Sequence, residues 1–384
     1  MKKCILFFAA LVSVFMSCRE DIELKMDDTT GVLCVNGFLY ADCDTNVLYI
    51  TETGISRPVP VTNAEVKMYV NGVLKEEVST SDNSGHYLLK EKFSPNDVVR
   101  IDVTSNSRHV WREATVPECP KDFSVEITPA PEKKYYDSYI EDYTTDNMYK
   151  IEVSFSDVSS GKNYYRLLVD KTSSVTSYDY HHDYYYADTV YIDGVEYISH
   201  KDTAYYEMKT HHGYNERLYI GEAPSLADEE MNATSEFTDG IYNYYKVFNN
   251  SRFAGGKCNL RVYDIVHFDY GNSFPPETKK VNSEKDIERL PVYSYTQYVG
   301  IESIDEETYY FIKALNGYES GSFDYQELTG AIKMRRNVEG GSGNIVFVSR
   351  DVKKIVLYDN YKPAPVFGEE EDDDDYSDDY YYNY

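Results

Sequence analysis

Residues 31–116 alternate apolar and polar side chains with a period of two, in short runs separated by turn residues. This period places every second side chain on one face of an extended strand, whereas a helix repeats after three or four residues. Residues 32–40 (VLCVNGFLY) and 46–53 (NVLYITET) are such runs, and Asn71-Gly72 supplies a two-residue hairpin turn. About seven short strands in this length predict an antiparallel β-sandwich over residues 31–117.

Strand alternation returns after Pro120 and predicts a second antiparallel sandwich over residues 118–360. Within it, residues 172–240 are rich in Tyr, Asp and His and have few aliphatic side chains to pack. We interpret this segment as an insertion of twisted hairpins, one of them turning at Asp193-Gly194.

One segment, residues 303–317 (SIDEETYYFIKALNG), has an apolar stripe at helical spacing. Ser303 and Glu306 match a capping box, and Asn316-Gly317 can end the helix. The predicted fold class is therefore mostly β: two antiparallel β-sandwich domains, one short helix in the second, and a Tyr-rich hairpin insertion.

The first seventeen residues are typical of a signal peptide, because Lys2 and Lys3 precede a short, largely apolar stretch that ends near Met16. The following "VFMSC" resembles a bacterial lipobox, in which cleavage leaves Cys18 as an acylated first residue, here followed by a linker over residues 18–30. Each buried methylene of an acyl chain contributes about 0.8 kcal/mol, so two or three chains hold a protein on a membrane without a transmembrane helix. The acidic residues after Cys18 resemble a Bacteroidetes surface-export signal. We therefore expect the outer face of an outer membrane.

The formal net charge of −28 repels phosphate backbones and argues against a nucleic-acid partner. The run EEEDDDDYSDD lies within residues 361–384, which we expect to form a disordered acidic, Tyr-rich tail. Whether this tail binds cations stays open. The cysteines of the mature chain besides Cys18 allow two disulfides in any of three pairings, and the sequence does not decide whether any forms: Cys34, Cys43, Cys119 and Cys258.

A row of aromatic residues is the candidate contact surface for a partner or ligand. On an extended strand, alternating residues of the stretch YDYHHDYYY share one face, and these are Tyr178, Tyr180, His182, Tyr184 and Tyr186. Amphipathic aromatic side chains can stack on a ligand while their polar ends donate hydrogen bonds. The alternative interpretation is that the row only covers a neighbouring hairpin.

Five of the eight histidines fall between His181 and His212, in the pairs His181-His182 and His211-His212 plus His200. Adjacent strand residues point to opposite faces, so a zinc or copper site requires His182 to meet His211 or His212. Such a site would support a metal-dependent hydrolase. No complete metal motif, phosphate loop or nucleophile motif is present, so no catalytic, cofactor or metal-binding residue is assigned and a non-enzymatic protein is expected.

Four stretches, together with the lipobox, occur in an order that resembles a family of Bacteroidetes lipoproteins known as domain of unknown function 4249: LCVNGFLY, VFNNSRFAGGKCNLRVY, VGIESIDEETYYFIKALN and NVEGGSGNIVFVS. The resemblance covers most of residues 18–358. It implies an immunoglobulin-like or carboxypeptidase-regulatory-like first sandwich. It assigns a known role to Cys18 alone. The Tyr-rich insertion and the acidic tail depart from the family pattern.

Members of that family often accompany TonB-dependent outer-membrane receptors. The resemblance therefore implies a lipid-anchored surface protein that assists a β-barrel transporter in nutrient uptake. The alternatives are the metal-dependent hydrolase and an adhesin or outer-membrane assembly component. The sequence names neither the ligand nor the oligomeric state.

Overall fold

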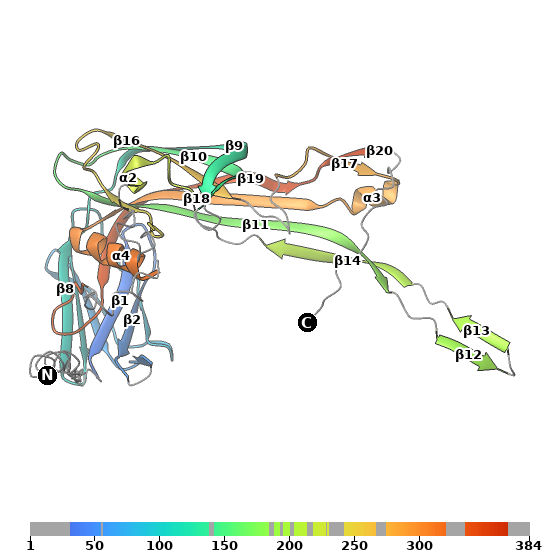
Figure 1. The fold of residues 1–384 in the computed structure, drawn as a ribbon. Helices are drawn as coiled ribbons and strands as arrows, with labels where there is room; N and C mark the ends of the chain where they lie inside the picture. The colour runs from blue at the N-terminus through green and yellow to red at the C-terminus, as the bar shows by residue number, and fades with distance from the viewer. Residues whose placement is uncertain are drawn as a thin grey trace, which may run out of the picture.

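The computed structural model describes the following residues: 31–54, 57–137, 142–183, 188–192, 195–199, 203–212, 218–227, 229, 242–265, 274–319 and 335–367. The signal peptide, Cys18, His200, Tyr184 and Tyr186 lie outside them. Figure 1 shows two β-rich bodies that meet at an angle, and a long two-stranded arm that leaves one of them. The fold is mostly β, as predicted.

The first sandwich packs two sheets around one apolar core, which includes Val35, Ile50, Met68 and Ile101. One sheet contains β1 (Leu33–Tyr40), β2 (Asn46–Glu52), β3 (Val59–Pro60) and β6 (His86–Leu89). The other contains β4 (Glu65–Val70), β5 (Val73–Val78), β7 (Val98–Ser105) and β8 (Arg108–Thr115), in the order β5-β4-β7-β8.

The turn between β4 and β5 is the predicted two-residue turn. Asn71 and Gly72 have φ angles of 51° and 77°. Both angles lie in the left-handed region that a type I′ turn requires.

The second sandwich places a three-stranded sheet over three strands of the large sheet. The three-stranded sheet has the order β16 (Lys257–Ile265), β10 (Asp142–Ser156), β9 (Lys121–Asp137). It faces β11 (Tyr164–Asp183), β18 (Val292–Ile304) and β19 (Ile345–Tyr361) across a core of aromatic and aliphatic side chains. The remaining elements of the chain are β12 (Asp188–Ile192), β13 (Val195–Ser199), β14 (Thr203–His212), α2 (Pro224–Ala227), β15 (Val247–Asn249), β17 (Thr278–Val281), α3 (Glu284–Glu288), α4 (Glu306–Glu319) and β20 (Ala364–Phe367).

The two sandwiches share one sheet, which runs in the order β14-β11-β18-β19-β1-β2-β3. The first residues of β19 pair with β1 in parallel, from Ile345 opposite Gly37 to Val348 opposite Tyr40. The rest of the strand pairs antiparallel with β18. The expectation of purely antiparallel sandwiches is therefore wrong at this strand. The core of the first sandwich also contains Val338, Ile345 and Phe347, which lie far beyond the boundary expected at residue 117.

The predicted helix forms as α4, but both of its ends differ from the prediction. The cap is Asp305, because the backbone N–H of Thr308 donates to Asp305 Oδ1 at 2.7 Å. Ser303 is instead a buried residue of β18, opposite Ser349 in β19. The helix also continues through Gly317 to Glu319.

Two further expectations change, and one question that the sequence left open is answered. Tyr361 belongs to β19 and residues 364–367 form β20, so the expected disordered tail does not begin at residue 361. The described part of the chain has three helices rather than one, and none of them is long and apolar enough to cross a membrane. The four cysteines whose pairing the sequence left open are free thiols.

Truncation of Phe347 tests whether β19 completes the first sandwich. Its ring is 0% exposed in that core, so Phe347→Ala should lower the free energy of unfolding by about 3–5 kcal/mol. The single tryptophan, Trp111, lies in β8, so its fluorescence during urea unfolding reports on the first sandwich. Val356→Ala, at a position of β19 that is 51% exposed, is the control and should change stability by less than about 0.5 kcal/mol. Equal effects of the two variants would contradict the shared core.

Candidate functional site

The arm in Figure 1 begins where β11 no longer pairs with β18. β11 pairs with β18 only as far as Thr176, opposite Val292, whereas its pairing with β14 continues to Asp183, opposite Thr203. Residues 177–183 and 203–209 therefore form a two-stranded ribbon beyond the sandwich, roughly 23 Å long at about 3.3 Å per residue. The hairpin of β12 and β13 follows, with Ile192 opposite Val195 on either side of Asp193-Gly194.

The register gives the ribbon one face of mainly aromatic and apolar positions. Directly opposed residues of an antiparallel pair lie on the same face of a sheet. Three of the candidate contact residues share a face with positions of β14: Tyr178 with Met208, Tyr180 with Tyr206, and His182 with Ala204. The other face carries mostly charged and polar positions, namely Ser177, Asp179, His181, Asp183, Thr203, Tyr205, Glu207 and Lys209.

The structure thus describes only part of the aromatic row that the sequence predicts. Tyr178, Tyr180 and His182 alternate along an extended strand, and Tyr184 and Tyr186 lie outside the described residues. Sequence reasoning missed Tyr206 and Met208, although the alternation in TAYYEMKTHH was the signal that could have identified them. A contact role for the row stays a prediction.

The same register separates the histidine pairs. His182 lies opposite Ala204, whereas His211 lies opposite Val175 and His212 opposite Ser174. Seven residues along β11 separate the positions of His182 and Val175, about 23 Å at strand spacing. The ribbon therefore does not bring His182 to His211 or His212, the meeting that the metal-site hypothesis requires.

A buried polar cluster anchors the base of the ribbon. Asp264 of β16 is 2% exposed, and its carboxylate accepts hydrogen bonds from Lys171 Nζ at 3.0 Å and Gln297 Nε2 at 2.6 Å. Tyr295 Oη donates to the same carboxylate at 3.1 Å. Because Lys171 lies on β11, Asp264 on β16, and Gln297 and Tyr295 on β18, the cluster ties the two sheets of the sandwich together just before the ribbon leaves.

Aromatic side chains also pack at the base of the ribbon. Tyr149 and Tyr295 stack with their ring centroids 5.3 Å apart, and both contact Val175 in a small apolar cluster. Burial, and then the nearby Asp264 carboxylate, raise the pKa of Tyr295 far above its ordinary value. Burial, and then the hydrogen bond to Tyr358, raise the pKa of Tyr149 as well. The hydroxyls of Tyr149 and Tyr295 therefore remain protonated and can donate hydrogen bonds. The ribbon thus projects from a tightly packed part of the second sandwich.

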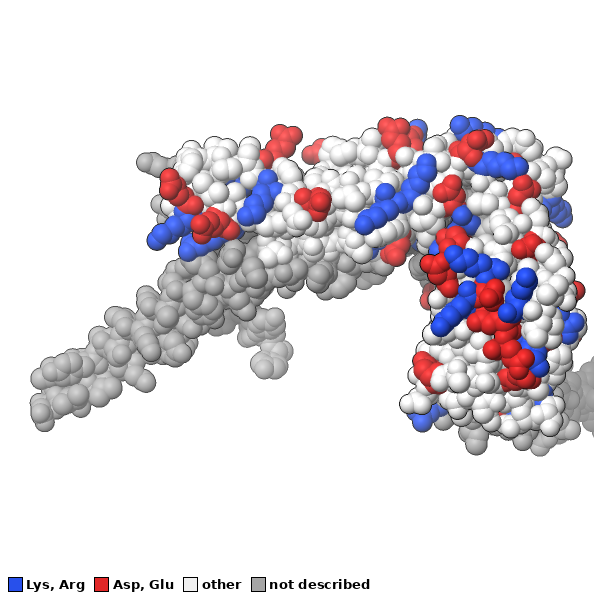
Figure 2. All heavy atoms as spheres, turned by 180° about the vertical axis from the view of Figure 1, so that it is seen from behind, with Lys and Arg blue, Asp and Glu red and all other residues white. Residues whose placement is uncertain are grey.

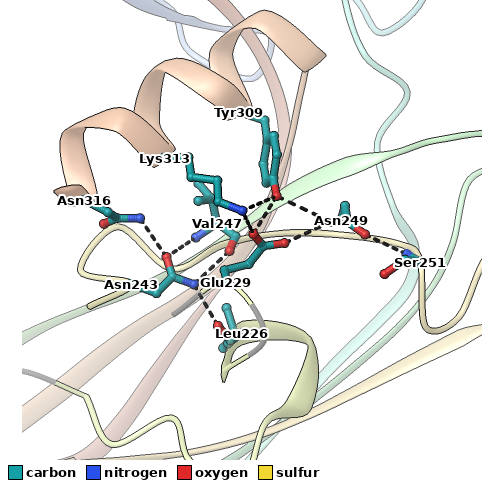
Figure 3. Close-up of polar contacts among 9 residues, drawn as sticks. All are labelled: Leu226, Glu229, Asn243, Val247, Asn249, Ser251, Tyr309, Lys313 and Asn316. Carbon is teal, nitrogen blue, oxygen red and sulfur yellow. Dashed lines mark hydrogen bonds and ion pairs between the residues drawn. The ribbon is translucent and has the colours of Figure 1, made fainter. Parts of the chain in front are cut away.

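A second polar cluster, shown in Figure 3, joins a carboxylate, a lysine and a tyrosine beneath α4. Glu229 Oε2 accepts hydrogen bonds from Tyr309 Oη and Lys313 Nζ, each at 2.6 Å, while Glu229 Oε1 accepts from Asn249 Nδ2 at 2.9 Å. Burial, and then the Glu229 bond, raise the pKa of Tyr309, so this tyrosine stays a donor. Internal partners thus occupy both carboxylate oxygens, and the cluster fixes α4 to β15.

Asn243 continues the cluster in Figure 3. It bonds to the backbone of Leu226 and Val247, and it accepts a hydrogen bond from Asn316 Nδ2 at 3.0 Å. We assign the whole cluster a structural role, because its polar atoms bond to one another and to the backbone rather than to an open surface.

A hollow of about 390 Å³ lies where the two sandwiches meet. Its acidic side chains already have structural partners: Asp305 caps α4 and pairs with Arg112, and Glu306 accepts a hydrogen bond from Tyr164 Oη at 2.7 Å. Among the residues with described side chains, no group of three or more His, Cys, Asp or Glu side chains is arranged to hold a metal ion.

The charges on the described surface are mixed. Figure 2 shows Lys and Arg interspersed with Asp and Glu over both bodies on the face that it draws. That face has no extended patch of a single sign that would select a strongly charged partner.

The fold and the ribbon define a mostly β protein of two sandwiches that share a sheet and extend one long hairpin. The chain belongs to the family described as domain of unknown function DUF4249, whose model matches residues 19–354. A search of curated proteins finds no match for this chain.

Removal of the Lys171 charge tests whether the buried cluster supports the ribbon. Lys171→Met leaves the Asp264 carboxylate buried without its cation, so the free energy of unfolding should fall by about 3–5 kcal/mol. Hydrogen exchange at the backbone amides of β11 and β14 should accelerate, and Lys171→Met/Asp264→Leu should recover part of the loss. The control is Lys354→Met, on the exposed surface of β19. Unchanged exchange in β11 would contradict the anchoring role.

Proposed function

We propose that this chain is an outer-membrane surface lipoprotein that acts by binding rather than by catalysis, as the accessory partner of a TonB-dependent nutrient transporter. The observation that carries the proposal is the ribbon: a long hairpin with a mainly aromatic and apolar face, anchored on a rigid sandwich. The sequence of residues 1–18 supports the membrane anchor. The choice of a transporter as partner follows from the sequence resemblance, which implies that members of this family often accompany TonB-dependent receptors.

The ribbon has the physical character of a contact element. An isolated two-stranded hairpin is marginally stable in water, because it lacks a layer that covers its apolar face. Positions of one face are occupied by Tyr178, Tyr180, Tyr206 and Met208. Tyr and Met are enriched in protein interfaces, where they supply large contact areas. Burial of this face against a partner would supply the missing layer.

The anchor and the ribbon can serve the same neighbour. The described chain begins at Gly31 in the first sandwich, while the ribbon leaves the second. Twelve residues lie between Cys18 and Gly31, and the thirteen steps from one Cα to the next span at most about 45 Å when extended. Within this reach the body can turn until the ribbon meets a β-barrel in the same membrane.

Shortening the ribbon tests the contact role. A variant that joins Ser177 to Lys209 through Asn-Gly keeps the first opposed pair of the ribbon and removes everything beyond it. Wild-type protein extracted in a mild detergent should co-purify a large β-barrel protein, and the shortened variant should lose at least about 90% of it. Release of the barrel by Tyr178→Ser/Tyr180→Ser, but not by Asp179→Ser/His181→Ser on the opposite face, should assign the contact to one face. If the shortened chain retains the barrel, or if wild type purifies alone, the proposal fails.

Replacement of Cys18 tests the anchor independently of the ribbon. Cys18→Ser removes the thiol that receives the acyl chains, so the protein should leave the membrane fraction and its N-terminus should carry no lipid mass. Cys34→Ser, at a free thiol of β1, is the matched control and should remain membrane-bound. Mass spectrometry of the N-terminal peptide measures the result. An unacylated wild-type N-terminus would contradict the assignment.

A further inference from the structure

The nine-stranded sheet ends at β14, whose outer edge has no strand partner among the residues that the structure describes. β14 has ten residues, contains no proline, and pairs with β11 without a register shift. A long, regular edge of this kind presents unpaired backbone N–H and C=O groups and is a template for the addition of another strand.

Several other described sheet edges carry features that hinder strand addition. β3 is two residues long and includes Pro60, and β20 includes Pro365. β9 contains Pro129 and Pro131 and has a register shift against β10, and β5 has a register shift against β4.

Backbone segments cover two more edges. Trp111 in β8 exchanges hydrogen bonds of 2.9 and 3.1 Å with Glu339, and Tyr263 in β16 exchanges bonds of 2.9 Å with Tyr219. β14, with ten residues, is thus the longest described edge that has neither a proline nor a covering segment; β12, β13 and residues 177–183 of β11 are also open but shorter.

We infer that β14 pairs antiparallel with β14 of a second copy of this chain, so that two ribbons join into one four-stranded sheet across a two-fold axis at Met208. This pairing addresses the weakness of each ribbon. Two strands alone are marginally stable, whereas three or more strands with an apolar face can be stable. The pairing leaves both faces of the sheet open, and it places the Tyr178 and Tyr206 faces of the two copies side by side.

Charge complementarity selects this register. In a two-fold antiparallel pair, the residue at the axis lies opposite its own copy, and residues equally far before and after it lie opposite each other. An axis at Met208 places Glu207 of each copy opposite Lys209 of the other, twice in the dimer, and pairs all positions from Ala204 to His212. An axis at Glu207 or at Lys209 would instead place like charges opposite each other, which destabilises strand pairing.

The backbone is compatible with this register. Leu167 of β11 donates to Lys246 O along the edge that β14 later occupies, so alternate residues of β11, including Ser177 and Asp179, direct their N–H and C=O groups toward that edge. Their opposites in β14, Lys209 and Glu207, face β11 in return. Met208 lies between them, so its backbone groups face the free edge and can bond to Met208 of the second copy.

A cysteine at the axis tests the register directly. Opposed, hydrogen-bonded strand residues have Cα atoms about 5.5 Å apart, within the range that a disulfide spans. Oxidation of the full-length Met208→Cys protein in membranes should produce a dimer on a non-reducing gel in most molecules. Wild type and Leu74→Cys, an exposed position on the edge strand β5, provide the background from native and displaced thiols. Dimer formation no greater than in Leu74→Cys would overturn the inference.

Charge reversal tests the same pairing without oxidation. Glu207→Lys and Lys209→Glu should each weaken self-association by about tenfold, because like charges then oppose each other twice. The double variant Glu207→Lys/Lys209→Glu restores opposite charges and should restore association to within about twofold. Glu126→Lys and Lys279→Glu change the net charge by the same amounts elsewhere on the surface and should have little effect. Sedimentation of the detergent-solubilised full chain gives the dissociation constants.

Each outcome of the charge-reversal experiment either supports or overturns the β14 pairing. Weakening by both single variants with rescue by the double variant supports the β14 pairing, whereas a monomer at all concentrations, or weakening without rescue, overturns it. The inference does not rest on the transporter partnership. A chain that dimerises through β14 but retains no β-barrel protein would sink the proposed function and leave this pairing standing.

Discussion

The backbone hydrogen bonds of β19 are the constraint on which the architecture depends. The strand spends its first residues beside β1 and its remaining residues beside β18, so one continuous ladder passes from one sandwich into the other. A ladder of this kind cannot bend freely between the two bodies without breaking bonds whose polar groups would then need new partners. The angle visible in Figure 1 is therefore built into a sheet rather than left to a linker.

A buried ionic group sits at the same junction. Glu302 of β18 is 0% exposed, with Arg166 Nε of β11 at 3.3 Å and Arg350 Nη1 of β19 at 3.8 Å. Burial raises the pKa of Glu302 despite the two guanidinium groups, which shows that loss of water outweighs their attraction. The Nε–H of Arg350 also donates a bifurcated hydrogen bond to both carboxylate oxygens of Asp42, just after β1. Such a group adds little stability, but it opposes any other alignment of these strands, because a shift would leave a charge buried without a partner.

Local signals in the sequence were sufficient for most strands, the Asn71-Gly72 turn and the existence of α4. They failed where a distant segment decided the outcome. Ser303 matches a capping box, yet β18 requires it opposite Ser349, so the helix starts two residues later on Asp305. The parallel pairing of β1 with β19 joins segments about 300 residues apart, which periodicity does not reveal. The run Ile345–Val348, buried on both faces, was the available clue, because strands covered on both sides read as continuous apolar runs.

In the candidate site, too, local signals predicted part of the arrangement and a distant segment decided the rest. Alternation along one strand was enough to place Tyr178, Tyr180 and His182 on a common face, since a strand has a period of two wherever it occurs. It could not supply the register against β14, which decides that the face also includes Tyr206 and Met208 and that the histidine pairs lie apart. Register is a property of two segments together, set here by the pairing that begins at Ser174 opposite His212.

The open edge of β14 differs from the other sheet edges, and the overall charge of the chain explains how such an edge can be tolerated. Proline, short length, a register shift or a covering segment is present at several of the other edges, and each feature lowers the tendency of an edge to pair with another chain. A protein with a strongly negative overall charge already resists random association, so an unprotected edge on a projecting ribbon need not cause aggregation. The same repulsion means that only a partner with matching backbone geometry and locally opposite charges gains enough to bind. An open edge on such a chain is therefore more selective than the same edge on a neutral one.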